Sequence, residues 1–195
     1  MKSVKRLVTI TLIIVLCVLL YYYYVNKDSR DSGKLTSEEQ LSEVEKVLLK
    51  DLDANYPTTP LEVVKFFTRI QKCYYNEDNT DEVVRELSDL ARKLFDDELL
   101  AKNPETEYFD SLKEEIQVYK KKHRTITNII FDKTTDVVYY TVDQDVHTAS
   151  LKCTYYVQSG KQLVSDTEVY VLRKDINGRW KIYGWMTDEP SQWER

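Results

Sequence analysis

The sequence is poor in the residues that build metal sites, disulfide scaffolds and phosphate-binding loops. Its 195 residues include 3 cysteines, 2 histidines and 4 glycines. Three cysteines are too few for a disulfide framework, and no two glycines have the G-x-G spacing of a nucleotide-binding loop. Neither C-x-x-C nor H-x-x-H occurs, whereas a structural zinc site uses about four such ligands. We therefore expect no metal and no cofactor, although a calcium site built only from carboxylates stays open.

Motifs of common catalytic centres are also missing. No G-x-S-x-G nucleophile elbow is present. Cys153 and His147 could be drawn as a nucleophile and its base, but a cysteine on the apolar side of a strand is favoured as an inert core residue. The same holds for Cys73, and a disulfide between Cys73 and Cys153 stays an alternative outside the cytoplasm. The sequence therefore predicts no catalytic residue and favours a protein that is not an enzyme.

Charge is distributed unevenly along the chain. The whole sequence has 28 Lys and Arg against 33 Asp and Glu, a net charge of -5, but residues 7–25 carry none of these. Without residues 1–25 the chain has 25 basic and 33 acidic side chains, a net charge of -8. Such an acidic domain is unsuited to a phosphate backbone, so we expect no nucleic-acid partner.

The uncharged residues 7–25 form an apolar run that is typical of a transmembrane helix. A helix of this length is about 28 Å long, close to the thickness of the hydrocarbon core. Lys2, Lys5 and Arg6 precede the run, so the positive-inside rule places residues 1–6 in the cytoplasm. We expect a single-pass protein of the cell membrane with its main domain extracytoplasmic.

Three other interpretations of this run stay open. A cleaved signal peptide would need small residues at a cleavage site, and none follows the run. A lipoprotein would be anchored through Cys17, but the preceding Leu16 is bulky where such signals resemble a small residue. A buried core helix of this length is seldom apolar on every face. An uncleaved anchor is the favoured interpretation.

Beyond the anchor, the pattern indicates a linker followed by helices. Residues 26–35 are polar and are typical of a linker. Residues 36–55 begin with a capping box at Thr36 and Glu39 and carry one apolar stripe. They predict an extra amphipathic helix, which either forms a short stalk or packs on the domain. Capping residues predict three further helix starts, at Thr59, Asn79 and Asn103.

After Lys122 the apolar period changes from that of helices to that of strands. Apolar and polar residues alternate over 149–158, as in a strand that buries one face. The D-I-N-G of 175–178 predicts a tight hairpin turn. The fold class predicted for residues 56–188 is α+β, with helices packed on an antiparallel sheet, and residues 189–195 form a tail. The five strands are expected over 125–132, 137–142, 149–158, 164–174 and 179–187.

Several segments resemble known families. The opening P-L-E-V-V-K-F-F (60–67) and the closing N-G-R-W-K-I-Y-G-W (177–185) resemble the nuclear-transport-factor-like superfamily, whose domains have helices in the concave side of a curved antiparallel sheet. The chain more closely resembles an uncharacterised family of single-span, membrane-anchored proteins from clostridial-type bacteria. That second resemblance implies architecture and location but no activity. It is carried by Y-P-T-T-P-L-E-V-V-K (56–65), L-F-D-D-E-L-L-A-K-N-P (94–104) and L-R-K-D-I-N-G-R-W-K-I-Y-G-W (172–185).

A cone-shaped fold of this kind can hold a pocket in which burial raises the pKa of a carboxylate. The candidates for that pocket are Glu168 with Asp166 beside it, and the aromatic residues Tyr155, Tyr170 and Trp180. This gives one hypothesis for function: a small-molecule pocket, with or without acid–base catalysis of an isomerase or hydrolase type.

The other hypothesis rests on aromatic residues that face away from the helices. Adjacent strand residues point to opposite faces, so Tyr156, Tyr183 and Trp185 should lie opposite Tyr155 and Trp180, together with Tyr139. Tyrosine and tryptophan are favoured in interfaces, although the first helix or the tail could also cover this face. The favoured function is a membrane-anchored, non-enzymatic binding or assembly module, with an unknown protein partner or a second copy on this face.

Overall fold

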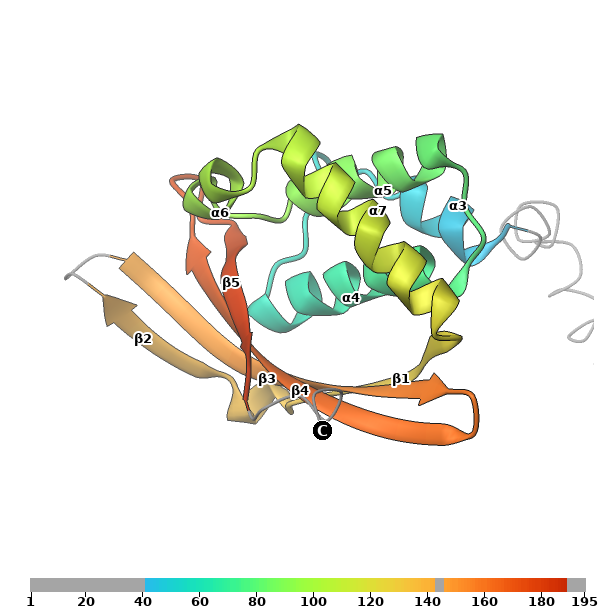
Figure 1. Cartoon of the computed structure of the whole chain (residues 1–195). Coiled ribbons are helices and arrows are strands. Elements are labelled where there is room, and N and C mark those ends of the chain that lie inside the picture. The colour runs from blue at the N-terminus through green and yellow to red at the C-terminus, as the bar shows by residue number, and fades with distance from the viewer. Residues whose placement is uncertain (1–40, 143–145, 189–195) are drawn as a thin grey trace, which may run out of the picture. The chain divides into compact units, whose positions relative to one another are not determined.

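Helices lie on one face of an antiparallel sheet in this chain (Figure 1). The structure is a computed structural model that describes residues 41–142 and 146–188. The predicted cytoplasmic tail, apolar run and linker (1–35) and the predicted tail (189–195) lie outside the described residues. Among the helices of the described part, none is long and apolar enough to cross a membrane.

The helix that starts at Pro60 follows the sequence prediction closely. The Thr59 side chain accepts a hydrogen bond from the N–H of Glu62 at 3.2 Å, and the Glu62 carboxylate accepts one from the N–H of Thr59 at 3.2 Å. This reciprocal pair is the predicted capping box. The described helices are α3 (Glu43–Leu48), α4 (Pro60–Asn76), α5 (Asp81–Arg92), α6 (Asp97–Lys102) and α7 (Glu105–Lys121).

Three helical features differ from the sequence prediction. Of the helix expected over 36–55, residues 36–40 with the predicted capping box lie outside the described residues, and the rest forms only the six-residue α3. Val47 in α3 and Leu52 after it are buried in the core. The side chain of Thr80, not Asn79, caps α5, while the Asn79 amide donates to the Cys73 carbonyl at 2.7 Å. The short helix α6 was not predicted, and the Asp96 carboxylate accepts from the N–H of Glu98 at 3.0 Å to cap it.

The sheet confirms the predicted α+β class and the five antiparallel strands. Strand β3 pairs with β4 along one edge, and with both β1 and β2 along the other. The edge opposite β4 is therefore divided between two short strands, with the turn η1 (Thr134–Asp136) between them. The strands are β1 (Arg124–Phe131), β2 (Val138–Val142), β3 (Val146–Ser159), β4 (Gln162–Lys174) and β5 (Trp180–Thr187).

The last hairpin forms as predicted, but β5 contains a bulge. Gly178 has a φ of 75° and its N–H donates to the Asp175 carbonyl at 2.9 Å. Farther along, Leu172 pairs with Ile182 whereas Val171 pairs with Gly184, so Tyr183 is the extra residue on β5. A bulge of this kind reverses the alternation of faces beyond it.

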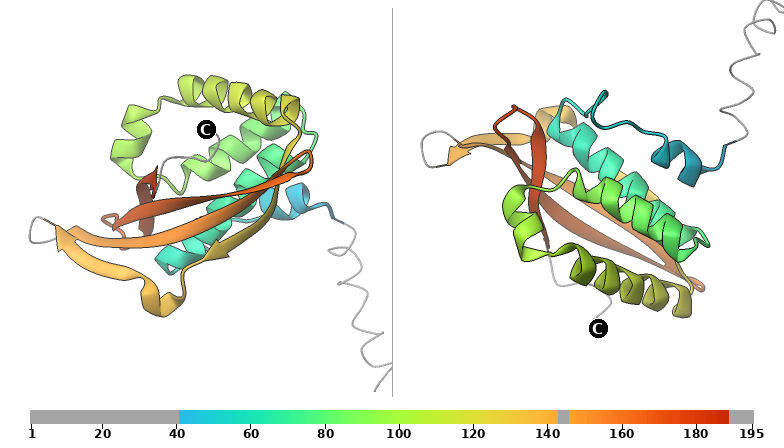
Figure 2. Two further views of the ribbon diagram at one scale, coloured as in Figure 1. Left: turned by 60° about the horizontal axis from the view of Figure 1, so that its bottom comes forward. Right: turned by 90° about the horizontal axis from the view of Figure 1, so that it is seen from above.

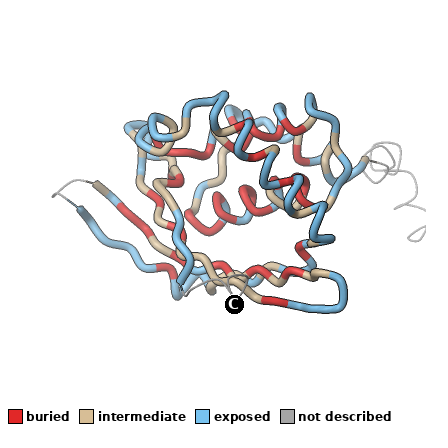
Figure 3. The backbone as a smooth tube through the Cα atoms, viewed as in Figure 1, coloured by how far each residue is buried: buried red, intermediate tan, exposed pale blue. Residues whose placement is uncertain are grey.

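The core lies between the helices and the face of the sheet that they cover (Figure 3). Helices α4, α5 and α7 run across this face, while β2 projects beyond them (Figure 2). On α4, Phe67 and Ile70 are buried, and they belong to the same core cluster as Leu151, Tyr170 and Leu172 of the sheet. Burial of these side chains supplies the main stabilisation of the fold.

Candidate functional site

Three of the predicted pocket residues meet in a buried chain of hydrogen bonds. Tyr155 on β3 and Tyr170 on β4 bring their hydroxyl oxygens within 2.6 Å of each other. The Tyr170 hydroxyl lies 2.7 Å from a carboxylate oxygen of Glu168, and the Tyr155 hydroxyl lies 2.7 Å from the amide oxygen of Gln71 on α4. The fourth predicted pocket residue, Trp180, lies apart from this chain beside Lys174 and Tyr139.

The number of protons in this chain determines the state of Glu168. The two tyrosine hydroxyls supply one proton each, but three oxygen–oxygen contacts need a proton. With the Gln71 oxygen as acceptor, the third proton resides on the Glu168 carboxyl group. If the Gln71 amide turns its NH₂ toward Tyr155, the amide supplies the third proton and Glu168 is ionised.

Electrostatics favour the protonated form of Glu168. The pKa of Glu168 is raised to about 7, chiefly by burial; hydrogen bonds with Tyr170 and Tyr155 act against this rise, and the negative charges of Asp166 and Glu115 add to it. Burial also raises the pKa of Glu115 on α7 and raises the pKa of Tyr155 and Tyr170 well above the ordinary value. A carboxyl group that titrates near neutral pH is suited to proton transfer.

Glu168 lines none of three hollows in the described part of the chain. Three hollows in the described part of the chain, of about 440 to 550 Å³, are lined by other residues. The tyrosine chain therefore has the polar groups of a catalytic site, but none of its residues lines any of these three hollows.

The cysteines behave as core residues. Cys73 and Cys153 are free and buried, and burial raises the pKa of their thiols to about 11 and about 12. His147 precedes Cys153 by six residues on β3, a separation of about 20 Å along a strand, so the two do not form a dyad. Among the described residues, no group of three or more His, Cys, Asp or Glu could hold a metal ion.

The four aromatic residues predicted to share the outer face do not do so. Tyr156 lies on that face, opposite Ser165. Trp185 lies on the helix-covered face instead, because the β5 bulge reverses the alternation, and its ring centroid is 5.4 Å from that of Phe67 and 5.8 Å from that of Tyr170. Gly184 next to it was the sequence signal for a bulge.

The other two candidates also lie apart from Tyr156. Tyr139 pairs with core-facing Ala149, so it lies on the face opposite Tyr156, with its ring 5.8 Å from that of Trp180. The prediction chose the wrong member of the Tyr139/Tyr140 pair, since the strand register is not visible in the sequence. Tyr183 sits at the bulge, with the Arg173 guanidinium 4.0 Å from its ring centroid.

The strand β2 is the most exposed apolar element of the described sheet. All five of its residues are exposed, including Val138 (58%), Tyr139 (56%) and Tyr140 (41%). It pairs with β3 on one edge, and in the described part of the chain no strand pairs with its other edge. An uncharged edge strand rich in β-branched and aromatic residues is a template for pairing with another chain.

Comparison with known proteins gives a family but no activity. A family model described as a domain of unknown function (DUF6715) matches residues 1–185. No match was found among curated proteins. The match agrees with the predicted resemblance to an uncharacterised family.

Proposed function

This chain belongs to the DUF6715 family, and we propose that it is a non-enzymatic binding module that captures an extended segment of a protein partner along the free edge of β2. The single observation that carries this proposal is the exposure of all five β2 residues next to an unpaired edge of the described sheet. Alternate residues of such an edge direct their N–H and C=O groups away from the sheet, where an added strand can pair with them.

The charge of the chain favours a different protein over a second copy. The sequence beyond residue 25 has a net charge of -8, so two copies repel each other. A partner segment with basic residues gains attraction from the same charge. The β2 side chains themselves are uncharged, and they offer apolar contacts on both faces of the added strand.

We propose that the module is attached to the cell membrane. The apolar run 7–25 would anchor the chain in the cell membrane with residues 1–6 in the cytoplasm and the main domain outside. Helices on one face of a sheet are compatible with a nuclear-transport-factor-like fold, and the proposed anchor accords with the sequence resemblance to single-span, membrane-anchored proteins of clostridial-type bacteria. In this architecture the edge of β2 would face partners at the outer surface of the membrane.

The alternative, a small-molecule pocket with acid–base catalysis, has weaker support. The pKa of Glu168 near 7 favours it. The described hollows, however, are lined by residues other than Glu168, Tyr170 and Tyr155. We therefore prefer the binding module.

The test compares β2 with exposed apolar residues on other strands. The full chain carrying Val138→Lys and Tyr140→Lys should lose at least about tenfold of its crosslinked partner in native membranes, because lysines on an edge prevent strand addition. The matched control is Leu163→Lys with Met186→Lys, which adds the same charge at positions that are 56% and 64% exposed on β4 and β5. Equal capture by both double variants would contradict the proposal, and a crosslink between two copies would identify self-association instead.

A further inference from the structure

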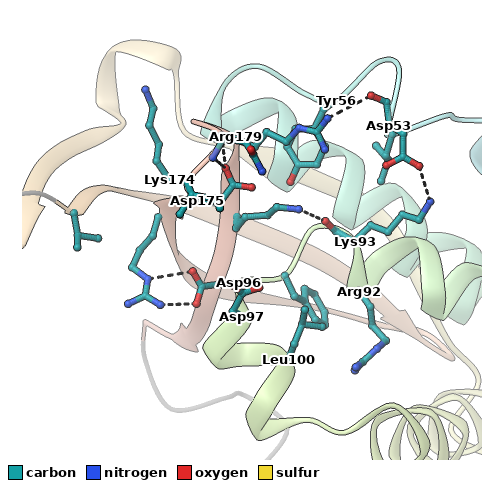
Figure 4. Close-up of a pocket in the computed structure, with 17 residues that line it drawn as sticks. Asp53, Tyr56, Arg92, Lys93, Asp96, Asp97, Leu100, Lys174, Asp175 and Arg179 are labelled. Carbon is teal, nitrogen blue, oxygen red and sulfur yellow. Dashed lines mark hydrogen bonds and ion pairs between the residues drawn. The ribbon is translucent and has the colours of Figure 1, made fainter.

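A second region, away from β2, gathers positive charge in an acidic protein. A hollow of about 550 Å³ lies between the turn at 52–56, the connection from α5 to α6 and the hairpin that joins β4 to β5 (Figure 4). Six basic and four acidic side chains line it, although the whole chain has a net charge of -5. They are Arg92, Lys93, Arg173, Lys174, Arg179 and Lys181, and Asp53, Asp96, Asp97 and Asp175.

Several of these charges are already paired. Lys93 lies 3.3 Å from an Asp53 carboxylate oxygen, and Arg173 lies 2.5 Å from one of Asp96. The Asp175 carboxylate accepts hydrogen bonds from two backbone N–H groups of its own hairpin. These groups therefore build the walls of the hollow and leave other cations available.

Two cations, Arg179 and Lys181, converge on the ring of Tyr56. The Arg179 guanidinium is 5.1 Å and the Lys181 ammonium 4.8 Å from the ring centroid. Tyr56 is held in place because its hydroxyl donates to the Trp180 carbonyl at 2.8 Å. Both cationic groups therefore lie beside the same anchored ring.

Neither cation forms a direct ion pair within the described part of the chain. The Lys181 ammonium donates to the Lys93 carbonyl at 2.5 Å and Arg179 to the Asp53 carbonyl at 3.4 Å. Among the described residues, no carboxylate oxygen lies within 4.0 Å of either side chain's charged nitrogens, so neither is in an ion pair. Lys181 is partly buried. Burial and the charge of Arg179 lower its pKa, against the charges of Asp175, Asp97 and Asp53, which raise it. A partly buried cation that no carboxylate contacts directly is stabilised when an anion binds beside it.

We propose that this hollow binds a phosphate ester through Arg179 and Lys181. A guanidinium fork matches phosphate oxygens in a bidentate way, and an ammonium group adds a point charge beside it. The volume suits a small organic phosphate. The negative charge of the rest of the chain repels an extended polyanion, which restricts the ligand to a small one. The same ester chemistry occurs in free metabolites and in lipid headgroups.

The test measures binding of two soluble probes to the full chain in a neutral detergent at low salt. Glycerol 3-phosphate represents a free monoester, and glycerophosphoglycerol represents the diester of a lipid headgroup. Calorimetric titration should detect binding of the monoester. Binding of the diester with equal or greater affinity would assign the site to a lipid headgroup, and binding of the monoester alone would assign it to a soluble ligand.

Variants separate this site from general charge effects. Arg179→Gln with Lys181→Gln should weaken binding at least about tenfold, because two charge-assisted contacts are lost. Lys133→Gln with Lys161→Gln removes the same charge from exposed positions outside the hollow and should leave binding unchanged. Arg179→Lys, which keeps the charge and removes the fork, should weaken binding less than the double variant. Absence of binding by the unaltered chain at millimolar probe, or equal loss in both double variants, would overturn the proposal.

Discussion

Strand β2 pairs along its whole length with the first five residues of β3, Val146–Ser150, yet the two strands differ sharply in burial. In β3, Ala149, Leu151, Cys153, Tyr155 and Val157 are buried under the helices and alternate with more exposed neighbours. In β2, every residue is exposed. The exposure of β2 is not a result of polar composition. Its sequence is V-Y-Y-T-V.

The difference comes from what lies over each strand. Helix α4 packs on β1, β3 and β5, whereas the main contact of β2 is with β3 (Figure 2). Apolar composition therefore stabilises β3 through burial and leaves β2 with apolar surface available to a partner. The following predictions test this contrast, from the largest expected effect to the smallest.

Truncation of an apolar side chain should lower the free energy of unfolding strongly on β3 and hardly at all on β2. Leu151 is 2% exposed, so Leu151→Ala should lower the free energy of unfolding by about 3–4 kcal/mol through lost burial and a cavity. Val138 is 58% exposed, so Val138→Ala should change it by less than about 0.5 kcal/mol. Urea unfolding of the two variants measures both effects, and similar losses would show that β2 is buried by another part of the protein.

The covered part of the sheet should also make stability depend on pH. Folding raises the pKa of Glu168 from its ordinary value of 4.5 to about 7. Between these values the folded state holds a proton that the unfolded state has lost, so the free energy of unfolding should fall as pH rises from 4.5 through 7. The stabilisation is complete below pH 4.5, and its loss amounts to about 3 kcal/mol.

Glu168→Gln tests that dependence because glutamine keeps the hydrogen-bonding groups but does not titrate. We expect a flatter pH profile between 4.5 and 7 for this variant, measured by urea unfolding at several pH values. Glu86→Gln, at an exposed position on α5, is the control and should leave the profile parallel to that of the unaltered chain. An unchanged slope in Glu168→Gln would show that another group carries the dependence.

The sequence predicted those features that depend on neighbouring residues in the chain. Alternation identified β3, the capping box identified the start of α4, and the D-I-N-G turn identified the last hairpin. Each of these signals is contained within a few residues, so no tertiary information was needed. The short helix α6 was missed because six residues are too few to show a helical period.

Features that depend on register or strand order could be predicted only in part. Glu168, Tyr170 and Tyr155 were named as neighbours, but the contact with Gln71 depends on how α4 packs on the sheet. The face of Trp185 was wrong because a bulge adds one residue to the alternation. The free edge of β2 follows from the strand order, which local alternation does not encode.

Polar pairs should show the same contrast on a smaller scale. The Asp96 carboxylate is largely buried, pairs with Arg173 and caps α6, so Asp96→Ala should lower the free energy of unfolding by about 2 kcal/mol. Glu98 remains within 3.0 Å of Arg173 and limits the loss. Asp81→Ala removes the exposed pair with Lys113 and should cost less than about 1 kcal/mol. Thermal or urea unfolding of both variants measures the two losses of stability. Equal losses would mean that burial does not determine the strength of these pairs.

Two glycines on or next to β5 allow the effect of backbone conformation on stability to be measured without an effect of burial. A Cβ added at Gly178 or at Gly184 meets no atom within 4 Å, so neither substitution to alanine creates a clash. Gly178 has a φ of 75°, a left-handed conformation that disfavours a side chain, so Gly178→Ala should cost about 1 kcal/mol. Gly184 lacks a positive φ, and Gly184→Ala should leave stability unchanged or raise it by about 0.5 kcal/mol because alanine restricts the unfolded chain. Urea unfolding measures the stability of both variants. A larger loss of stability for Gly184→Ala than for Gly178→Ala would show that the β5 bulge, which turns Trp185 toward the core aromatics, itself requires glycine.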